Sequence, residues 1–330
     1  MNKNVSIITP CYNGEAYISR FLESVLSQRY RPIELIIIND GSTDNTEHVL
    51  CSFKERLEQK GINYIYLQQE NKGQSAAINL ALPIFTGEYV AFVDSDDILP
   101  PDAIEKKVDY MEQRPQIGLL INKVKVLDFE TLSVLGTMER KQPMGKDHLF
   151  ADLISGNNVF YTPGGYFWRA NMFRDSMPKP LQIAAPREIG QNFQLILPIA
   201  YKYPVGYLDD YLYFYLIRPN SHSRTKHTYE QILKNWGVAH DVLSSVADDI
   251  ERDSAKRKHI QNLIDSRYYH ELMSHAYNYK NKTDFKTYRN QWIRIQAGNN
   301  KTKAFLLQLN LWGRRHFNKA KAYVSTLLTK

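Results

Sequence analysis

Cysteine is scarce in this sequence, and so are segments that could enter a membrane. Only two cysteines, Cys11 and Cys51, occur in 330 residues, which argues against a disulfide framework and for a reducing compartment. The apolar run at 5–9 is too short for a signal peptide, and no apolar stretch reaches the roughly 18 residues that span a bilayer. We therefore expect a cytoplasmic protein, either free or peripheral on the inner face of the cell membrane.

Glycine-rich phosphate loops are missing as well. After the first predicted strand the sequence has neither the G-x-G-x-x-G pattern of dinucleotide folds nor the G-x-x-x-x-G-K-[ST] pattern of P-loops. It also lacks zinc-ligand spacings and nucleic-acid recognition motifs, so nucleic acid is not an expected partner. A protein of this kind that binds phosphates must neutralise their charge with some other group.

What the sequence does have is enough apolar material for a large core and an uneven charge. Hydrophobic residues make up 43% of the chain, which suits one large domain or a catalytic domain with an accessory one. The net charge is +7, yet roughly nineteen Lys and Arg against nine Asp and Glu follow Thr225, which leaves the first two thirds slightly acidic. The basic C-terminal third predicts an anionic partner there.

Apolar runs alternate with helical periodicities over the start of the chain. Strands are predicted at 5–9, 33–38, 62–67 and 89–93, with amphipathic helices after the first three. Strand and helix in this alternation predict an α/β fold with a mostly parallel central sheet and right-handed crossovers. Ligands bind such sheets at the carboxyl ends of the strands.

The rest of the chain has mixed helices and strands first and helical periodicity afterwards. Further helices are predicted at 102–114, 147–154 and 188–201, and further strands at 117–126, 132–135, 205–208 and 211–217. The segment 162–169 is predicted to combine a flexible loop with an aromatic strand. From Thr228 onward the periodicity is helical, with breaks at 248–253 and 298–300. We place a boundary near Thr225, which gives a catalytic domain at 1–224 and a basic helical region at 225–330.

Three carboxylates follow the fourth predicted strand within four positions. Asp94, Asp96 and Asp97 crowd negative charge at the end of a buried strand. Like charges this close destabilise one another unless a cation compensates them. The cluster therefore predicts a site for a divalent metal or a cationic ligand, with a solvated acidic turn as the alternative.

Four motifs stand in order around this acidic strand: Thr9-Pro10-Cys11-Tyr12-Asn13, Asn39-Asp40-Gly41-Ser42-Thr43-Asp44, Asn71-Lys72-Gly73 and Asp94-Ser95-Asp96-Asp97. In this order and spacing the chain resembles the inverting glycosyltransferases of family 2, which have the GT-A fold. The resemblance is strong at the start of the chain, loose to Ser223 and absent after Thr225. It implies a metal-dependent enzyme that moves a sugar from a nucleoside-diphosphate donor, most simply UDP, to a hydroxyl of a glycan or lipid-linked acceptor in cell-surface polysaccharide synthesis.

The resemblance also implies a donor site. Asp96 would be the more direct ligand of Mn²⁺ or Mg²⁺, and Asp94 would lie near the ribose or the metal, because a divalent ion with hard oxygen ligands stabilises a departing diphosphate. Asp40 would accept hydrogen bonds from a uracil-like base edge, unless it is a capping aspartate. The other implied contacts are Thr9, Pro10, Tyr12, Lys72 and Ser95 for the donor, Arg218 or Arg224 for the diphosphate, and His222 for the metal or diphosphate.

Inversion requires a base that removes the proton of the acceptor hydroxyl. In the family this base is usually the second acid of a [DE]-D pair at the start of a helix, and here the equivalent stretch 187–192 holds one acid, Glu188. Glu188 is therefore the candidate, with Asp209 and Asp210 as runners-up and a first-turn dipole role as the structural alternative. Candidates for sugar contacts are Gln191, Asn192, Gln194, Tyr166 and Trp168, of which the two aromatic residues could instead belong to the core.

An apolar stripe with a cationic border runs through 301–330. It predicts an amphipathic helix that docks on an anionic membrane, or that packs on the catalytic domain or across a homo-oligomer interface. Two other functions stay open for the whole chain. A nucleotidyltransferase would also have paired acids, but the glycine-rich segment expected after its first strand is missing from this sequence. A non-catalytic sugar- or lipid-binding scaffold is disfavoured because the acids are intact.

Overall fold

The computed structural model of this chain describes residues 2–140, 149–156, 159–160, 162–187, 191–218 and 227–298. Within them, eight strands form one sheet in the order β3-β2-β1-β4-β7-β5-β6, and β8 joins β5. The strands are β1 (Val5–Cys11), β2 (Ile33–Asp40), β3 (Ile62–Gln69), β4 (Tyr89–Phe92), β5 (Leu119–Asp128), β6 (Val134–Met138), β7 (Tyr166–Arg169) and β8 (Val205–Ile217). The first four run parallel, which confirms the predicted α/β fold with its mostly parallel sheet.

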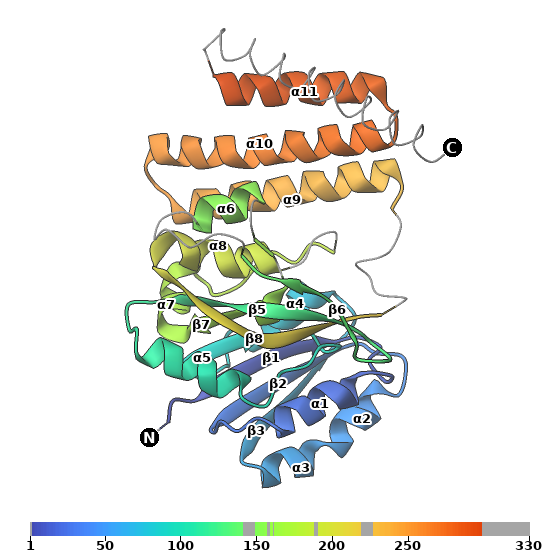
Figure 1. Cartoon of the computed structure of the whole chain (residues 1–330), viewed down its shortest axis with the longest axis vertical. Coiled ribbons are helices and arrows are strands. Elements are labelled where there is room, and N and C mark those ends of the chain that lie inside the picture. Colours follow the sequence, from blue (N-terminus) through green and yellow to red (C-terminus); the bar gives the residue numbers. More distant parts are fainter. Residues whose placement is uncertain are drawn as a thin grey trace, which may run out of the picture.

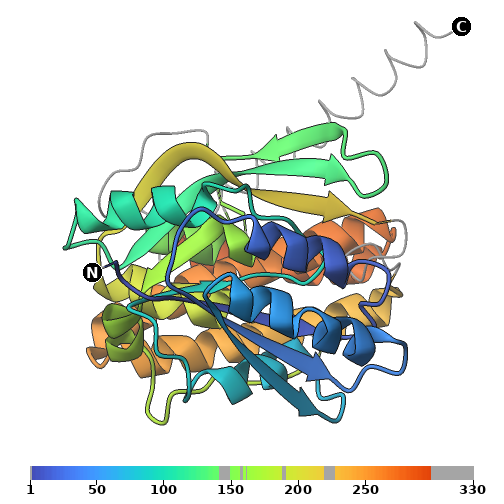
Figure 2. The same ribbon diagram turned by 90° about the horizontal axis from the view of Figure 1, so that it is seen from below.

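Helices cover both faces of the parallel part, which is why β1 and β2 are buried along their whole length. On one side lie α1 (Ile18–Leu26), α2 (Thr46–Ser52) and α3 (Lys54–Gln59), and on the other lies α4 (Gln74–Ala81) (Figure 1, Figure 2). The single helix predicted to run to Gln59 is therefore two short helices that meet at the buried Phe53.

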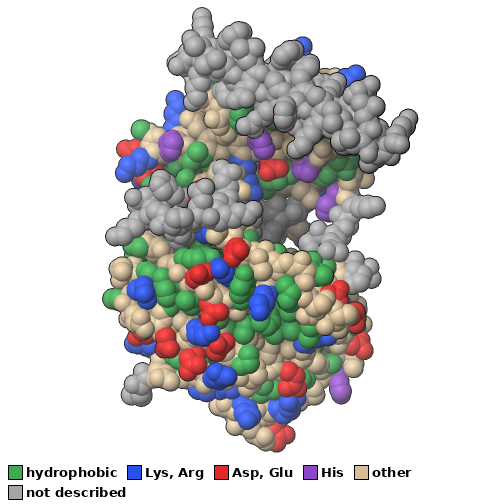
Figure 3. All heavy atoms as spheres, viewed as in Figure 1, with side chains coloured by type: hydrophobic (Ala, Val, Ile, Leu, Met, Phe, Trp, Pro, Cys, Tyr) green, Lys and Arg blue, Asp and Glu red, His purple; other side chains and the backbone are tan. Residues whose placement is uncertain are grey.

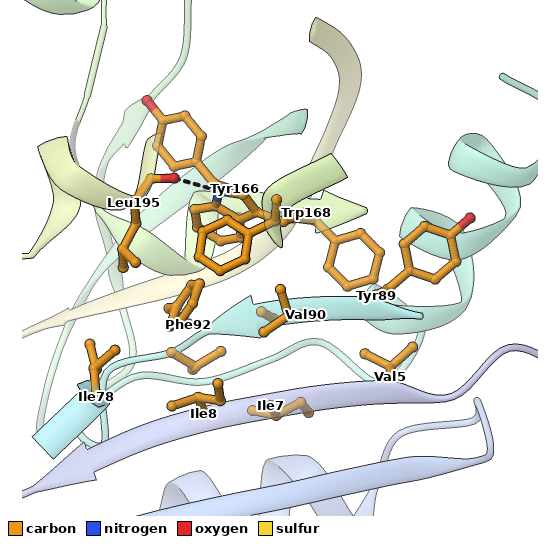
Figure 4. Packing of buried hydrophobic residues seen from close by; sticks show 14 of the residues in the cluster. Val5, Ile7, Ile8, Ile78, Tyr89, Val90, Phe92, Tyr166, Trp168 and Leu195 are labelled. Atoms are coloured by element: carbon orange, nitrogen blue, oxygen red, sulfur yellow. Dashed lines mark hydrogen bonds between the residues drawn. The ribbon is translucent and has the colours of Figure 1, made fainter. Parts of the chain in front are cut away.

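The central core is aromatic where β4 and β7 pair. The ring of Phe92 meets that of Trp168 edge-on with centroids 4.9 Å apart, and the indole N–H of Trp168 donates to the carbonyl oxygen of Leu195 at 3.0 Å (Figure 4). Leu195 belongs to α8 (Asn192–Lys202). Tyr166 and Trp168 are both buried, so they are core residues and not stacking surfaces for a sugar.

The second half of the sheet is built around β5. Its antiparallel partner β6 confirms the predicted strand pair, whereas the two strands predicted at 205–217 are one strand, β8. The pairing of β8 with β5 is irregular where Asp209 and Asp210 are inserted between Leu208 and Tyr211. The short elements around this half are α5 (Ala103–Glu112), α6 (Leu149–Ser155), the 3₁₀ turn at Pro163–Gly165 and α7 (Ala170–Ser176).

Three long helices stack beyond α8: α9 (Tyr229–Ile250), α10 (Ser254–Asn278) and α11 (Lys282–Ala297) (Figure 1). As predicted, the helical part begins after Thr228, which forms a capping box with Gln231. The predicted break at 248–253 separates α9 from α10, but the break between α10 and α11 was not predicted. There Lys280 has a positive φ of 58° and Asn281 caps α11.

Figure 3 shows charged side chains of both signs mixed over the α/β part, with His side chains gathered on the stacked helices. Among the described residues, no helix has the length and hydropathy to cross a bilayer. The stripe at 301–330 lies outside the described residues, so its docking stays a prediction, as does the division near Thr225.

Candidate active site

The predicted motifs meet at one edge of the sheet. Because β1 lies between β2 and β4 and all three are parallel, their carboxyl ends lie side by side, with Cys11 opposite Asn39 and Ile8 opposite Phe92. Thr9 to Tyr12 therefore lie between Asp40 on one neighbour and the acids that follow β4 on the other. This juxtaposition is the one expected for a ligand site on an open α/β sheet.

Asp94 and Asp96 each have one partner among the described side chains. Gln74, at the start of α4, donates to Asp94 Oδ1 at 2.7 Å. Arg218, just after β8, donates from Nε and Nη2 to Asp96 Oδ2 at 3.0 and 2.6 Å, and its guanidinium lies 4.1 Å from the centre of the Tyr17 ring. Burial, with the charge of Asp96 added, raises the pKa of Asp94 to about 7. The two carboxylates therefore repel each other, and an added cation would relieve that repulsion.

The carboxylates of Asp94 and Asp96 could supply some, but not all, of the oxygen ligands of a divalent cation. Among the described residues, no group of three or more His, Cys, Asp or Glu side chains is arranged to hold a metal. Mg²⁺ and similar ions in nucleotide sites are commonly held by one or two carboxylates, with phosphate oxygens completing the shell. Asp94 and Asp96 supply that number of oxygen ligands, so they fit a cation that binds together with a diphosphate.

The third acid of the cluster has a different task. Asp97 is buried, its Oδ2 accepts a hydrogen bond from the Tyr213 hydroxyl at 2.5 Å, and its Oδ1 accepts one from the backbone N–H of Leu216 at 2.8 Å. Backbone bonds between Ile98 and Phe214 fasten the same two segments together. Asp97 thus ties β8 to the acidic segment and sets the position of Arg218 two residues past Leu216.

Asp40 holds the loop between β3 and α4. Its Oδ1 accepts hydrogen bonds from Gln69 Nε2 at 2.6 Å and from the backbone N–H of Lys72 at 2.9 Å, and its Oδ2 accepts one from the backbone N–H of Gly73 at 2.9 Å. Gly73 has a φ of 91°, a conformation that favours glycine. The loop is therefore fixed beside the site and leaves the Lys72 side chain exposed. Contact of Asp40 and Lys72 with a nucleoside stays a prediction.

The other predicted donor residues surround the end of β1. Tyr12 is 39% exposed, so its ring is available to a ligand, while Pro10 and Ser95 are buried. Thr9 is buried, and its Oγ1 has no hydrogen-bond partner among the described residues. A buried hydroxyl without a partner is uncommon, and here it lies on the strand whose end faces the site.

The candidates for catalysis and for metal or diphosphate binding either lie outside the described residues or form ion pairs. Glu188, His222 and Arg224 lie outside the described residues, so their roles stay predictions. The runners-up for the base form ion pairs: Asp209 with Lys123 at 2.5 Å and Asp210 with Lys106 at 2.6 Å.

The polar residues of α8 also differ in what they can offer a sugar. The amide of Gln194 is bound twice to the backbone of Ala184, so it is not free for a sugar. Gln191, in contrast, is buried with an Oε1 that no described group satisfies. Asn192 has an Oδ1 in the same condition, although its side chain has other interactions.

Three residues of the site were not predicted from the sequence: Gln74, Tyr213 and Lys107. Gln74 could have been found as the first residue of a helix that begins at the Asn71-Lys72-Gly73 motif. Tyr213 gave no signal, because tyrosines also occupy neighbouring positions of β8. Lys107 is fully buried on α5, three residues after Ile104 and four before Met111. This helical spacing is the signal in the sequence that could have placed it on the inner face.

Comparison with known protein families and sequences agrees with this geometry. The family model "Glycosyl transferase family 2" matches residues 6–176, just over half of the chain. An uncharacterized glycosyltransferase of Haemophilus influenzae is 32% identical over 177 residues, 52% of this chain and 53% of the relative. The putative teichuronic acid biosynthesis glycosyltransferase TuaG of Bacillus subtilis is 43% identical over 110 residues, 33% of this chain and 42% of TuaG. The matches thus span about half the length of these relatives, or less.

Comparison with solved structures covers nearly the whole chain. S. aureus TarS 1–349 in complex with UDP-GlcNAc superposes with a TM-score of 0.64 at 19% identity, over 89% of this chain and 80% of that one. The mannosyltransferase PcManGT from Pyrobaculum calidifontis, in complex with GDP-Man and Mn²⁺, gives a TM-score of 0.56 at 15% identity, over 98% and 83%. At these identities the likeness concerns the fold, and it confirms the predicted GT-A architecture.

Proposed function

Because this chain belongs to glycosyl transferase family 2, we propose that it transfers a sugar, with inversion, from a UDP-sugar to a hydroxyl of a glycan or lipid-linked acceptor in cell-surface polysaccharide synthesis. The observation that carries the proposal is the convergence of Asp94, Asp96 and Arg218 at the carboxyl edge of the sheet. Two carboxylates and one guanidinium suit a diphosphate that arrives with a divalent cation. The similar fold of TarS, solved in complex with UDP-GlcNAc, and the relative TuaG, a putative teichuronic acid biosynthesis glycosyltransferase, support this choice of donor and pathway.

In the proposed reaction Asp94 and Asp96 would hold Mn²⁺ or Mg²⁺, and the ion would supply Lewis-acid stabilisation of the leaving diphosphate. Arg218 donates to Asp96, so its guanidinium would lie close to a diphosphate bound at the same cation. There its N–H groups would donate hydrogen bonds to a diphosphate oxygen as negative charge develops. The end of β1, with Tyr12 exposed and Thr9 Oγ1 lacking a partner, is the proposed surface for the nucleoside. Glu188, which precedes the first residue of α8 by four positions in the sequence, is the proposed base.

A panel of nucleotide sugars tested by thermal shift, with and without Mn²⁺, examines this proposal. A ligand that binds only the folded state raises the melting temperature by mass action. We expect a UDP-sugar with Mn²⁺ to raise it more than either component alone, followed by slow release of UDP. Release of pyrophosphate would indicate a nucleotidyltransferase, binding without turnover would indicate a scaffold, and no shift with any nucleotide would contradict the proposed function.

The substitution Glu188→Gln separates chemistry from binding. A general base contributes about 10²–10⁴-fold to the rate and does not hold the nucleotide. We therefore expect kcat for UDP release to fall by about 10²-fold or more, while the Kd for UDP with Mn²⁺ is unchanged. Asp209→Asn and Asp210→Asn are the matched controls, because their ion pairs with lysines leave them poorly suited to accept a proton. A larger loss in either control would reject Glu188.

A further inference from the structure

A lysine is fully buried beneath the proposed active site. Lys107 lies on the inner face of α5, where its side chain has no exposure to solvent, in line with the apolar residues Ile104 and Met111. Lysine is almost never buried completely unless an acid pairs with it. No ion pair involves Lys107 among the described residues, so this position departs from the usual pattern of a helix core.

The amine of Lys107 has one specific partner. Its Nζ donates to the carbonyl oxygen of Gly164 at 3.1 Å and lies 5.9 Å from the centre of the Phe167 ring. Burial alone lowers the pKa of Lys107 to about 7. An apolar side chain of the same length would fill this space without the cost of removing an amine from water. The hydrogen bond to the Gly164 carbonyl is the described contact that offsets this cost.

Gly164 connects this amine to the acid cluster. It lies in the buried turn Pro163–Gly165, and a Cβ at this position would come within 1.8 Å of Tyr213 Cε2, so the tyrosine ring packs directly against the glycine. The same edge of the ring carries the hydroxyl, which donates a hydrogen bond to Asp97 and accepts one from the backbone N–H of Asp94 at 3.3 Å. A shift of the turn would therefore move the Tyr213 ring, and with it the backbone that carries Asp94 and Asp96.

We propose that Lys107 is a positioning residue of the transfer reaction, which acts through the Gly164 carbonyl and the Tyr213 ring to hold the acid pair in place. The inference rests on the proposed function. It assigns no contact between Lys107 and the substrate. Its role is to fix the turn through the hydrogen bond from its amine to the Gly164 carbonyl. Positioning of this kind matters because a misplacement of about 1 Å at a reacting centre can cost about 10² in rate.

Two variants and one control test the proposal. Lys107→Met removes the amine and keeps the length and volume, and Lys107→Gln restores an N–H donor toward Gly164. Lys106→Met is the control, because Lys106 is the adjacent lysine of the same helix, partly exposed and paired with Asp102 and Asp210. We expect Lys107→Met to melt no lower than the wild type but to release UDP at least tenfold more slowly, Lys107→Gln to recover part of the rate, and Lys106→Met to stay within about twofold.

Hydrogen exchange gives a readout that needs no nucleotide. The amides of Asp94, Ile98 and Leu216 are bonded across the contact between the acid segment and β8. In Lys107→Met, peptides over 93–99 and 211–217 should exchange at least about tenfold faster despite unchanged global stability, and in Lys106→Met they should not. Unchanged exchange and an unchanged rate in Lys107→Met would overturn the proposal. If the wild type binds no nucleotide sugar, the proposed function fails, while the exchange comparison still decides whether Lys107 holds the acid pair.

Discussion

Replacing Asp96 by Asn is expected to abolish measurable transfer and to remove the effect of Mn²⁺ on UDP binding, while the protein remains folded. Asp96 is one of the two carboxylates that the described residues offer to a cation in this proposal, so the loss of its charge removes half of those carboxylate ligands. Leaving-group stabilisation of this kind is worth about 10²–10³ in rate or more. The fold should persist because the Asp96 side chain is 22% exposed, and its described hydrogen-bond partner is Arg218 at the rim of the site.

The same chemical change one residue away is the control. Asp97→Asn puts an amide where the carboxylate of Asp97 accepts the N–H of Leu216 and the hydroxyl of Tyr213, so it should lower the melting temperature. Isothermal titration of UDP, with and without Mn²⁺, should show that Asp96→Asn loses the metal dependence at wild-type stability. If Asp96→Asn binds UDP with an unchanged dependence on Mn²⁺, Asp96 is not part of the metal site.

The parts of the fold that could be predicted are those set by local pattern. Buried parallel strands read as continuous apolar runs, so β1 to β4 were found with their ends within a few residues. The parts of the fold that were predicted wrongly or missed depend on tertiary contacts or on a backbone conformation that the local sequence does not reveal. The two halves of β8 are one strand because β5 pairs with both, through an irregularity at Asp209 and Asp210 that no local signal reveals. The turn between α10 and α11 is set by Lys280 in a left-handed conformation, which the sequence alone does not indicate for a lysine.

The site shows the same division. The acid cluster was predicted from its crowding, but the sequence could not tell Asp97 from its two neighbours. Its direction is fixed by Tyr213 and Leu216, more than a hundred residues later in the chain. The sequence pattern does not single out Lys107, because a lysine on an amphipathic helix usually marks the solvent face. Its spacing from Ile104 and Met111 was the available signal, and the burial of the amine is a tertiary fact.

The burial of Lys107 has a consequence for stability that does not involve activity. Its pKa falls from the ordinary 10.5 to about 7 in the folded chain, with burial as the cause. Between these two pH values the unfolded chain holds the proton and the folded chain does not, so the free energy of unfolding rises with pH. The slope is about 1.4 kcal/mol per pH unit for one proton. Below pH 7 both states are protonated, and the full cost of the buried charge is present.

We therefore expect the stability difference between wild type and Lys107→Met to change by about 2 kcal/mol or more between pH 7.5 and 9.5, in favour of the wild type as the pH rises. Titratable groups on the neighbouring elements, among them Lys106 with Asp102 and Asp210 on one side and Tyr213 with Asp97 on the other, are common to both chains and largely cancel in the difference. Urea unfolding of the two proteins at pH 7.5, 8.5 and 9.5 measures it, with Lys106→Met as the control that should follow the wild type. Unfolding free energies for wild type and Lys107→Met that stay parallel across this range would mean that the amine of Lys107 is protonated in the folded protein, and therefore hydrated or paired rather than buried.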